Sequence, residues 1–82
     1  MNVLDGFSAV VVTQLIEAGR MDITPGAQEQ VVCFVANYLR KEGVGGSLVS
    51  TTAQALLVCP EVEEVYLDDA ELKELITDLG LL

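Results

Sequence analysis

The sequence contains no histidine and no tryptophan, and it has only four lysine or arginine residues. Without histidine, it lacks the side chain that most often serves as a general base or a metal ligand near neutral pH. With so few cations, it has little with which to hold a phosphate group or an oxyanion. We therefore expect a protein that is not an enzyme and that needs no cofactor or metal.

Cysteines, aromatic residues and long apolar runs are also scarce. The two cysteines, Cys33 and Cys59, allow one disulfide at most, and no histidine is available to activate either thiol. We expect both to be small, reduced and buried. Two phenylalanines and two tyrosines are too few for a platform on which nucleic acid bases stack. The longest uncharged run, residues 44–60, is too short and too polar to span a bilayer.

What the sequence does have is apolar residues and acid. It is 51% hydrophobic and carries a formal net charge of −9. Residues 61–82 contain eight acidic residues and one lysine, a net charge of 1 − 8 = −7. This charge disfavours direct binding to nucleic acid and to an anionic membrane surface. Residues 1–5 lack the positive charge of a signal peptide, so we expect a cytoplasmic protein.

The apolar periodicity predicts one all-α domain over residues 1–82, a small four-helix bundle-like fold with an acidic C-terminal segment at 61–82. A first helix is expected over residues 6–18, with Asp5 as its cap and Gly19 just after its end. The β-branched run at residues 10–13 would also suit a strand.

A second helix is expected to open at Thr24-Pro25, with proline at its first position, and to end at Gly43. Ser47 or Ser50 can cap a third helix that stops before Pro60. No residue of this third helix is charged, which is typical of a helix that is covered on most sides. We expect it to be either the central element of the core or half of a subunit interface.

Residues 61–67 fit either a single helical turn or a short extended edge. The strongest local signal follows, where Asp68 and Glu71 form a capping box at the start of a last helix. Leu67 and Leu72 fit the accompanying hydrophobic staple. Gly80 then ends the helix, and Leu81 can close back on it in a Schellman motif.

The segment Gly45-Gly46-Ser47-Leu48 is similar to the Gly-x-Asp-Ser-Leu motif of acyl carrier proteins, which are also small, acidic, four-helix proteins. The resemblance covers four residues, and Gly46 stands where the family has aspartate. It implies a carrier function in which Ser47 bears a phosphopantetheine arm.

Four apolar helical faces exceed what so small a domain can bury, and this surplus favours association. The leading hypothesis is therefore a non-catalytic protein-interaction module, such as an adaptor, a regulatory subunit or a chaperone-like binder, that binds another protein and forms a homo-oligomer such as a homodimer. The alternative is an acidic inhibitor or mimic that blocks a basic site on a nucleic-acid-binding protein or another partner protein. The candidate partner-binding residues are Phe34, Val35, Tyr38, Leu48, Val49, Leu56, Glu61, Glu63, Glu64 and Tyr66.

Overall fold

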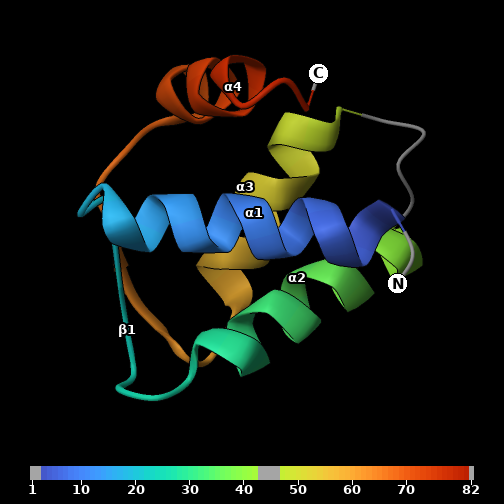
Figure 1. Cartoon of the computed structure of the whole chain (residues 1–82). Coiled ribbons are helices and arrows are strands. Elements are labelled where there is room, and N and C mark those ends of the chain that lie inside the picture. The colour runs from blue at the N-terminus through green and yellow to red at the C-terminus, as the bar shows by residue number, and fades with distance from the viewer. Residues whose placement is uncertain (1–2, 43–46, 82) are drawn as a thin grey trace.

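A computed structural model describes residues 3–42 and 47–81 of the chain. Six elements follow one another: α1 (Val3–Glu17), β1 (Met21–Ile23), α2 (Gln28–Glu42), α3 (Leu48–Val58), β2 (Val62–Val65) and α4 (Asp69–Asp78). The helices α1 and α2 lie side by side, α3 crosses behind them, and α4 lies over the top (Figure 1). The fold is mostly helical, but the small sheet means that it is neither all-α nor a helix bundle.

Helix α1 includes the β-branched run at residues 10–13, which could have formed a strand. It buries Phe7, Val11 and Leu15, which are spaced as one helical face requires. Asp5 does not cap this helix, because the helix starts two residues earlier; instead its carboxylate pairs with Arg40 of α2 at 3.1 Å. Gly19 ends the helix as expected, with a positive φ of 71° and a Schellman pattern of hydrogen bonds.

Pro25 was predicted at the first position of α2, and this was wrong. The segment Thr24–Ala27 is a turn closed by a hydrogen bond of 3.0 Å from the Ala27 N–H to the Thr24 carbonyl. Gly26 has a φ of 79° in this turn, a conformation that cannot continue into a helix. Helix α2 therefore starts at Gln28 and runs to Glu42. The expected stop at Gly43 lies outside the described residues.

Helix α3 is capped by Ser47, one of the two serines considered. The Ser47 hydroxyl accepts a hydrogen bond from the Ser50 N–H at 3.2 Å. The helix ends at Val58, and its C-cap, Cys59, is extended because the residue before a proline disfavours helical geometry.

Residues 62–65 are extended, which resolves the alternative left open by the sequence. β2 pairs antiparallel with β1, with Met21 opposite Val65 and a β-bulge between Asp22 and Ile23. Met21 and Val65 pack on the core, whereas Asp22 and Glu64 point to solvent on the other side of the sheet. The sheet therefore closes one end of the helical core.

The last helix forms as predicted. Asp68 and Glu71 make both hydrogen bonds of the capping box, at 2.8 and 3.2 Å. At its other end, the Leu81 N–H reaches the Ile76 carbonyl at 3.2 Å, and Gly80 has a φ of 75°. The Gly80 N–H also donates to the Thr77 carbonyl, at 2.9 Å. These two hydrogen bonds and the positive φ of Gly80 form the Schellman motif.

Candidate protein-interaction surface

The predicted partner-binding residues of α2 divide between the core and the surface. Val35 is fully buried between the helices, so its burial places it in the core and not on a surface that a partner can reach. Phe34 and Tyr38 are half-buried one turn apart, and their rings stack with centroids 6.2 Å apart. Both pack partly against the core and keep part of their area exposed.

The predicted residues of α3 also divide. Val49 and Leu56 are buried and belong to the core, whereas Leu48 is half-buried. The exposed apolar residues of this helix are Leu57 and Val58, and the Leu57 side chain is 72% exposed. Neither was among the predicted partner-binding residues, because the prediction placed Leu48, Val49 and Leu56 on the binding face of this helix instead.

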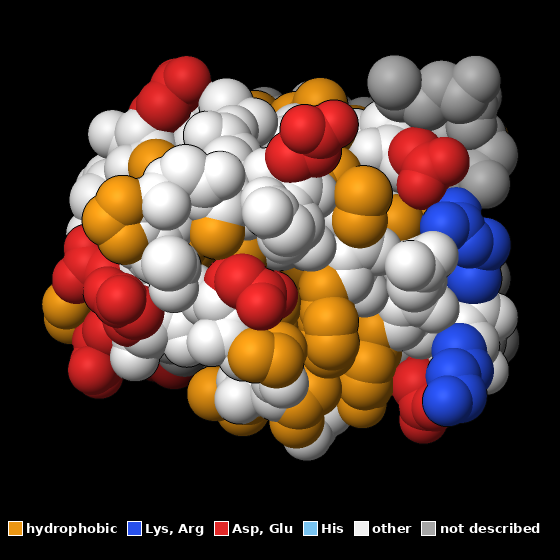
Figure 2. All heavy atoms as spheres, turned by 90° about the horizontal axis from the view of Figure 1, so that it is seen from below, with side chains coloured by type: hydrophobic (Ala, Val, Ile, Leu, Met, Phe, Trp, Pro, Cys, Tyr) orange, Lys and Arg blue, Asp and Glu red, His pale blue; other side chains and the backbone are white. Residues whose placement is uncertain are grey.

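The underside of the molecule carries apolar side chains on its surface. Hydrophobic side chains gather in a strip near the middle of this face, and the visible lysine and arginine side chains lie at one end (Figure 2). Carboxylates are most numerous at the opposite end, but others lie in the middle and beside the basic side chains. Apolar area is thus grouped on this face, as it is on surfaces that bind other proteins.

A small groove lies beside Leu57, where α3, β2 and the start of α4 meet. It has a volume of about 130 Å³, and its lining residues are Ala53, Leu56, Leu57, Val65, Leu67, Asp68, Asp69 and Leu72. Six of these eight side chains are apolar, and Leu56 and Leu72 are buried members of the core. The groove therefore has an apolar lining that continues directly into the interior.

Two carboxylates also line the groove. Asp68 is held in place by the capping box, since its Oδ1 accepts the Glu71 N–H at 2.8 Å. Asp69 is the first residue of α4 and is exposed. The positive end of the helix dipole stabilises anions at both positions. Lys73, the one basic residue of α4, lies one turn further along the helix.

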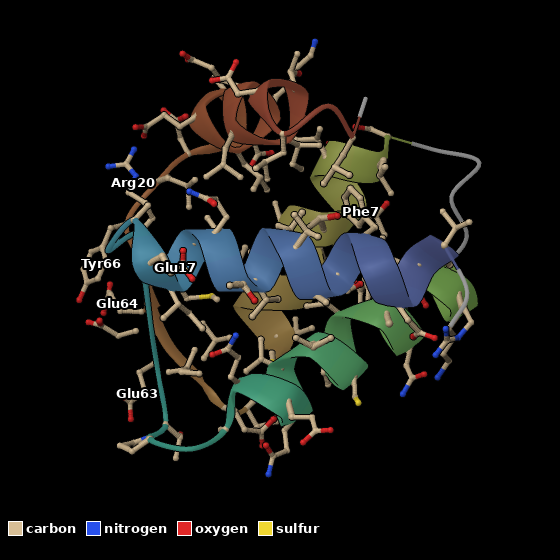
Figure 3. All side chains as sticks on the ribbon, viewed as in Figure 1. Phe7, Glu17, Arg20, Glu63, Glu64 and Tyr66 are labelled. Atoms are coloured by element: carbon tan, nitrogen blue, oxygen red, sulfur yellow. The ribbon has the colours of Figure 1, made fainter. Side chains whose placement is uncertain are left out.

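The sheet carries a second group of acidic residues. Glu63 and Glu64 are exposed, Glu61 is half-buried, and Tyr66 is 49% exposed. Figure 3 shows Glu63, Glu64 and Tyr66 projecting at the same end of the molecule. Three of the four predicted residues of this segment thus lie at one end of the molecule, whereas Glu61 lies beside Cys59, with 3.6 Å between its Oε1 and the Cys59 Sγ.

Tyr66 is tied to the neighbouring strand by a hydrogen bond from its hydroxyl to the Asp22 carboxylate. This hydrogen bond raises the pKa of the Tyr66 hydroxyl above its ordinary value. Partial loss of hydration and the negative charges of Asp22, Glu64 and Glu63 act in the same direction. The phenol therefore stays protonated and donates at physiological pH.

A wider cleft separates the end of α1 from α4. It has a volume of about 360 Å³, and Arg20 and Glu71 on its walls form an ion pair. Glu71 therefore joins α4 to the segment after α1 while it also completes the capping box. Both side chains are partly exposed, so this ion pair adds little to stability. Its main effect is to fix the position of α4 relative to the segment after α1.

The two thiols are in different environments. Cys59 is buried, and burial is the main cause that raises the pKa of its thiol. Its Sγ lies 3.6 Å from Oε1 of Glu61, whose negative charge also disfavours the thiolate. Cys33 was expected to be buried but is exposed on the outside of α2, because it lies opposite the face that packs on α1. Both cysteines are free.

Within residues 3–42 and 47–81, no group of three or more potential ligand side chains is placed to hold a metal ion. None of the helices in the same ranges combines the length and the hydropathy of a membrane span. Comparisons of the chain with protein-family models, with curated proteins and with solved structures give no match. Any function must therefore be inferred from this chain's own surface.

Proposed function

We propose that this protein is a non-catalytic protein-interaction module that binds another protein through the apolar groove beside Leu57. The observation that carries the proposal is the groove itself, with Leu57 72% exposed at its wall. Burying a leucine side chain contributes about 1.5–3 kcal/mol, so the folded chain leaves this stabilisation available to a partner.

The available chemistry supports a binding role over a catalytic one. The chain has no histidine, and the buried Cys59 lies next to a carboxylate that disfavours its thiolate. A thiol without an activating base is a poor nucleophile. We expect the protein to act in the cytoplasm and without a cofactor.

Self-association is part of this proposal. Half-buried Phe34 and Tyr38 on α2 give a second copy an apolar surface to pack on. The test is the solution mass, measured by light scattering behind size exclusion over a range of protein concentrations. A mass that rises to that of a dimer supports a homodimer, and a constant monomer mass removes this part of the proposal.

The interaction role is tested by two variants with the same charge change. Leu57→Asp alters the groove, whereas Val3→Asp alters an 85% exposed valine on α1 that does not line it. Immobilised wild-type protein and both variants are incubated with lysate from the native host, and captured proteins are quantified by mass spectrometry. We expect one protein to be retained by the wild type and Val3→Asp and lost with Leu57→Asp. Equal capture by all three contradicts the proposal.

A second candidate function is an acidic blocker of a basic site on a partner protein. It is supported by the exposed carboxylates of Asp22, Glu63 and Glu64 at one end of the sheet. Such a complex weakens steeply with salt. Partner binding that is insensitive to salt and to the double change Glu63→Gln and Glu64→Gln rules it out.

The carrier function implied by the acyl carrier resemblance has a direct test of its own. Ser47 is exposed at the start of α3, although its hydroxyl is engaged as the helix cap. The intact mass of protein purified from its native host decides the matter. A mass increase that is lost in Ser47→Ala supports the carrier function, and the unmodified mass excludes it.

A further inference from the structure

We propose that the groove beside Leu57 receives one apolar side chain of a lysine- or arginine-rich segment of the partner protein. This inference rests on the proposed function and names the chemistry of the partner. It is argued from the size of the groove, the composition of its lining and the distribution of charge around it.

The size of the groove fits one side chain. Its volume of about 130 Å³ is close to that of an engineered apolar cavity of about 150 Å³ that admits benzene. A leucine, methionine or phenylalanine side chain is of this size, whereas a whole helix is not. The partner is therefore expected to present a single apolar anchor.

The lining separates the groove into an apolar base and a charged border. Leu56 and Leu72 are buried beneath it, and Leu57 stands exposed at its side. Asp68 and Asp69 are the lining residues that carry charge, and both are acidic. An anchor that enters the groove thus brings its flanking residues close to two carboxylates.

Charge decides between a foreign partner and a second copy of this chain. Residues 61–82 have a net charge of −7, and the whole chain has −9. A second copy seated in the groove brings further negative charge toward Asp68 and Asp69, and such like-charge contacts are unfavourable. Lys73 alone cannot offset them. The lysine or arginine side chains of a basic segment are instead attracted to Asp68 and Asp69.

The other partner classes fit less well. A nucleic acid or an anionic membrane brings phosphate groups to a surface that is already negative. A neutral apolar molecule could fill the groove but makes no use of its acidic border. The basic peptide segment is the partner that matches both the lining and the charge.

The probe is a synthetic peptide, acetyl-Lys-Lys-Ala-Leu-Lys-Lys-amide, added to the 82-residue protein labelled with nitrogen-15. We expect the amide signals of Ala53, Leu57, Leu67 and Asp69 to shift together as the peptide saturates. Replacing the peptide leucine by alanine should weaken binding about tenfold, because the anchor loses most of its apolar area. A peptide with glutamate in place of every lysine should not bind.

Two variants with the same type of charge change localise the charged contact. Asp69→Asn removes a carboxylate from the groove, and Glu74→Gln removes one from the far side of the same helix, where it lines the wider cleft. Asp69→Asn should weaken peptide binding about two- to fivefold, the range expected for loss of an exposed ion pair. Glu74→Gln should leave the affinity for the peptide unchanged. Thermal unfolding of both variants checks that the fold is intact.

Three results overturn the inference. They are shifts that map away from the groove, equal affinity for the glutamate peptide, and groove signals that move with protein concentration in the absence of peptide. The last result assigns the groove to a second copy. Failure of the peptide together with partner loss in Leu57→Asp overturns this inference and leaves the interaction role standing. If the peptide binds in the groove but Leu57→Asp captures the same proteins as the wild type, the proposed interaction role fails and the inference about the groove stands.

Discussion

The α1–α2 pair and the region made by α3, β2 and α4 use apolar residues in different ways. The first region buries a row of apolar side chains between its two helices: Val11 and Val12 of α1 and Val31 and Val35 of α2 are all fully buried. The second region buries Leu56 and Leu72 but leaves Leu57 exposed beside an apolar groove. The difference separates a scaffold from a surface that is open to a partner.

Element length explains this difference. Helices α1 and α2 have 15 residues each and can cover one another along their whole length. Helices α3 and α4 have 11 and 10 residues, and β2 has four. Short elements that meet at angles cannot cover every apolar side chain, so a groove remains where their ends meet.

Truncating matched leucines should separate the two regions most clearly. Leu39→Ala removes a fully buried side chain and should destabilise the protein by about 2–5 kcal/mol. Leu57→Ala removes an exposed one and should change stability by less than about 0.5 kcal/mol. Urea unfolding followed by circular dichroism measures both. A large loss for Leu57→Ala means that Leu57 is part of the core and that the groove is closed in solution.

The start of α4 depends on its cap. Asp68→Ala removes the side chain that accepts the Glu71 N–H and should cost about 1 kcal/mol. Asp68→Asn keeps a capping group and serves as the control. If both variants unfold at the wild-type urea concentration, α4 does not start at this residue.

Helix α1 contains one buried polar side chain without a hydrogen-bond partner in the part of the chain that the structure describes. This is Ser8, which is fully buried. A buried hydroxyl of this kind is destabilising, so Ser8→Ala should stabilise the protein by up to about 1 kcal/mol. Ser8→Val should not do so, because it adds volume to a packed site. A clear loss of stability in Ser8→Ala means that the hydroxyl has a partner in solution.

The smallest effect concerns the sheet. In a Tyr38→Phe background, ultraviolet absorbance follows Tyr66 alone, and its pKa should lie above the ordinary value of about 10. Asp22→Asn should lower it, because the hydrogen bond to a carboxylate is the main cause of the shift. Since the folded-state pKa is raised, the stabilisation is present below the unfolded pKa and is lost as the pH rises through the folded one. Identical titrations with and without Asp22→Asn exclude the contact.

Local signals in the sequence predicted the helix ends that depend on local chemistry. The capping box at Asp68, the Schellman glycines and the Ser47 cap are formed by residues within a few positions of one another. The predicted start of the second helix at Pro25 was wrong because Thr24-Pro25 suits both a helix start and a turn. The positive φ of Gly26 shows that the segment is a turn. The β1–β2 pairing was not predicted, because it joins residues about 40 positions apart in the sequence. The strands have only three and four residues, which is too short for a recognisable alternation of apolar and polar residues.

The candidate surface was predictable only in part. The acidic residues Glu63 and Glu64 and the exposed ring of Tyr66 follow from composition and hydrophilicity. Leu56 and Leu57 are adjacent leucines on one apolar helix, and the sequence does not say which of them faces the core. That is decided by where α4 and β2 pack, so the groove became visible only in three dimensions.

The most direct test of the account is whether the folded protein holds an open apolar groove beside Leu57. Benzene dissolved in the buffer is a small apolar probe of such sites, and its effect is read from the amide spectrum of the nitrogen-15-labelled protein. We predict saturable shifts confined to residues around the groove, including Ala53, Leu57 and Leu67, with none at Val3. Shifts absent from the groove, or spread over the whole protein, contradict the account.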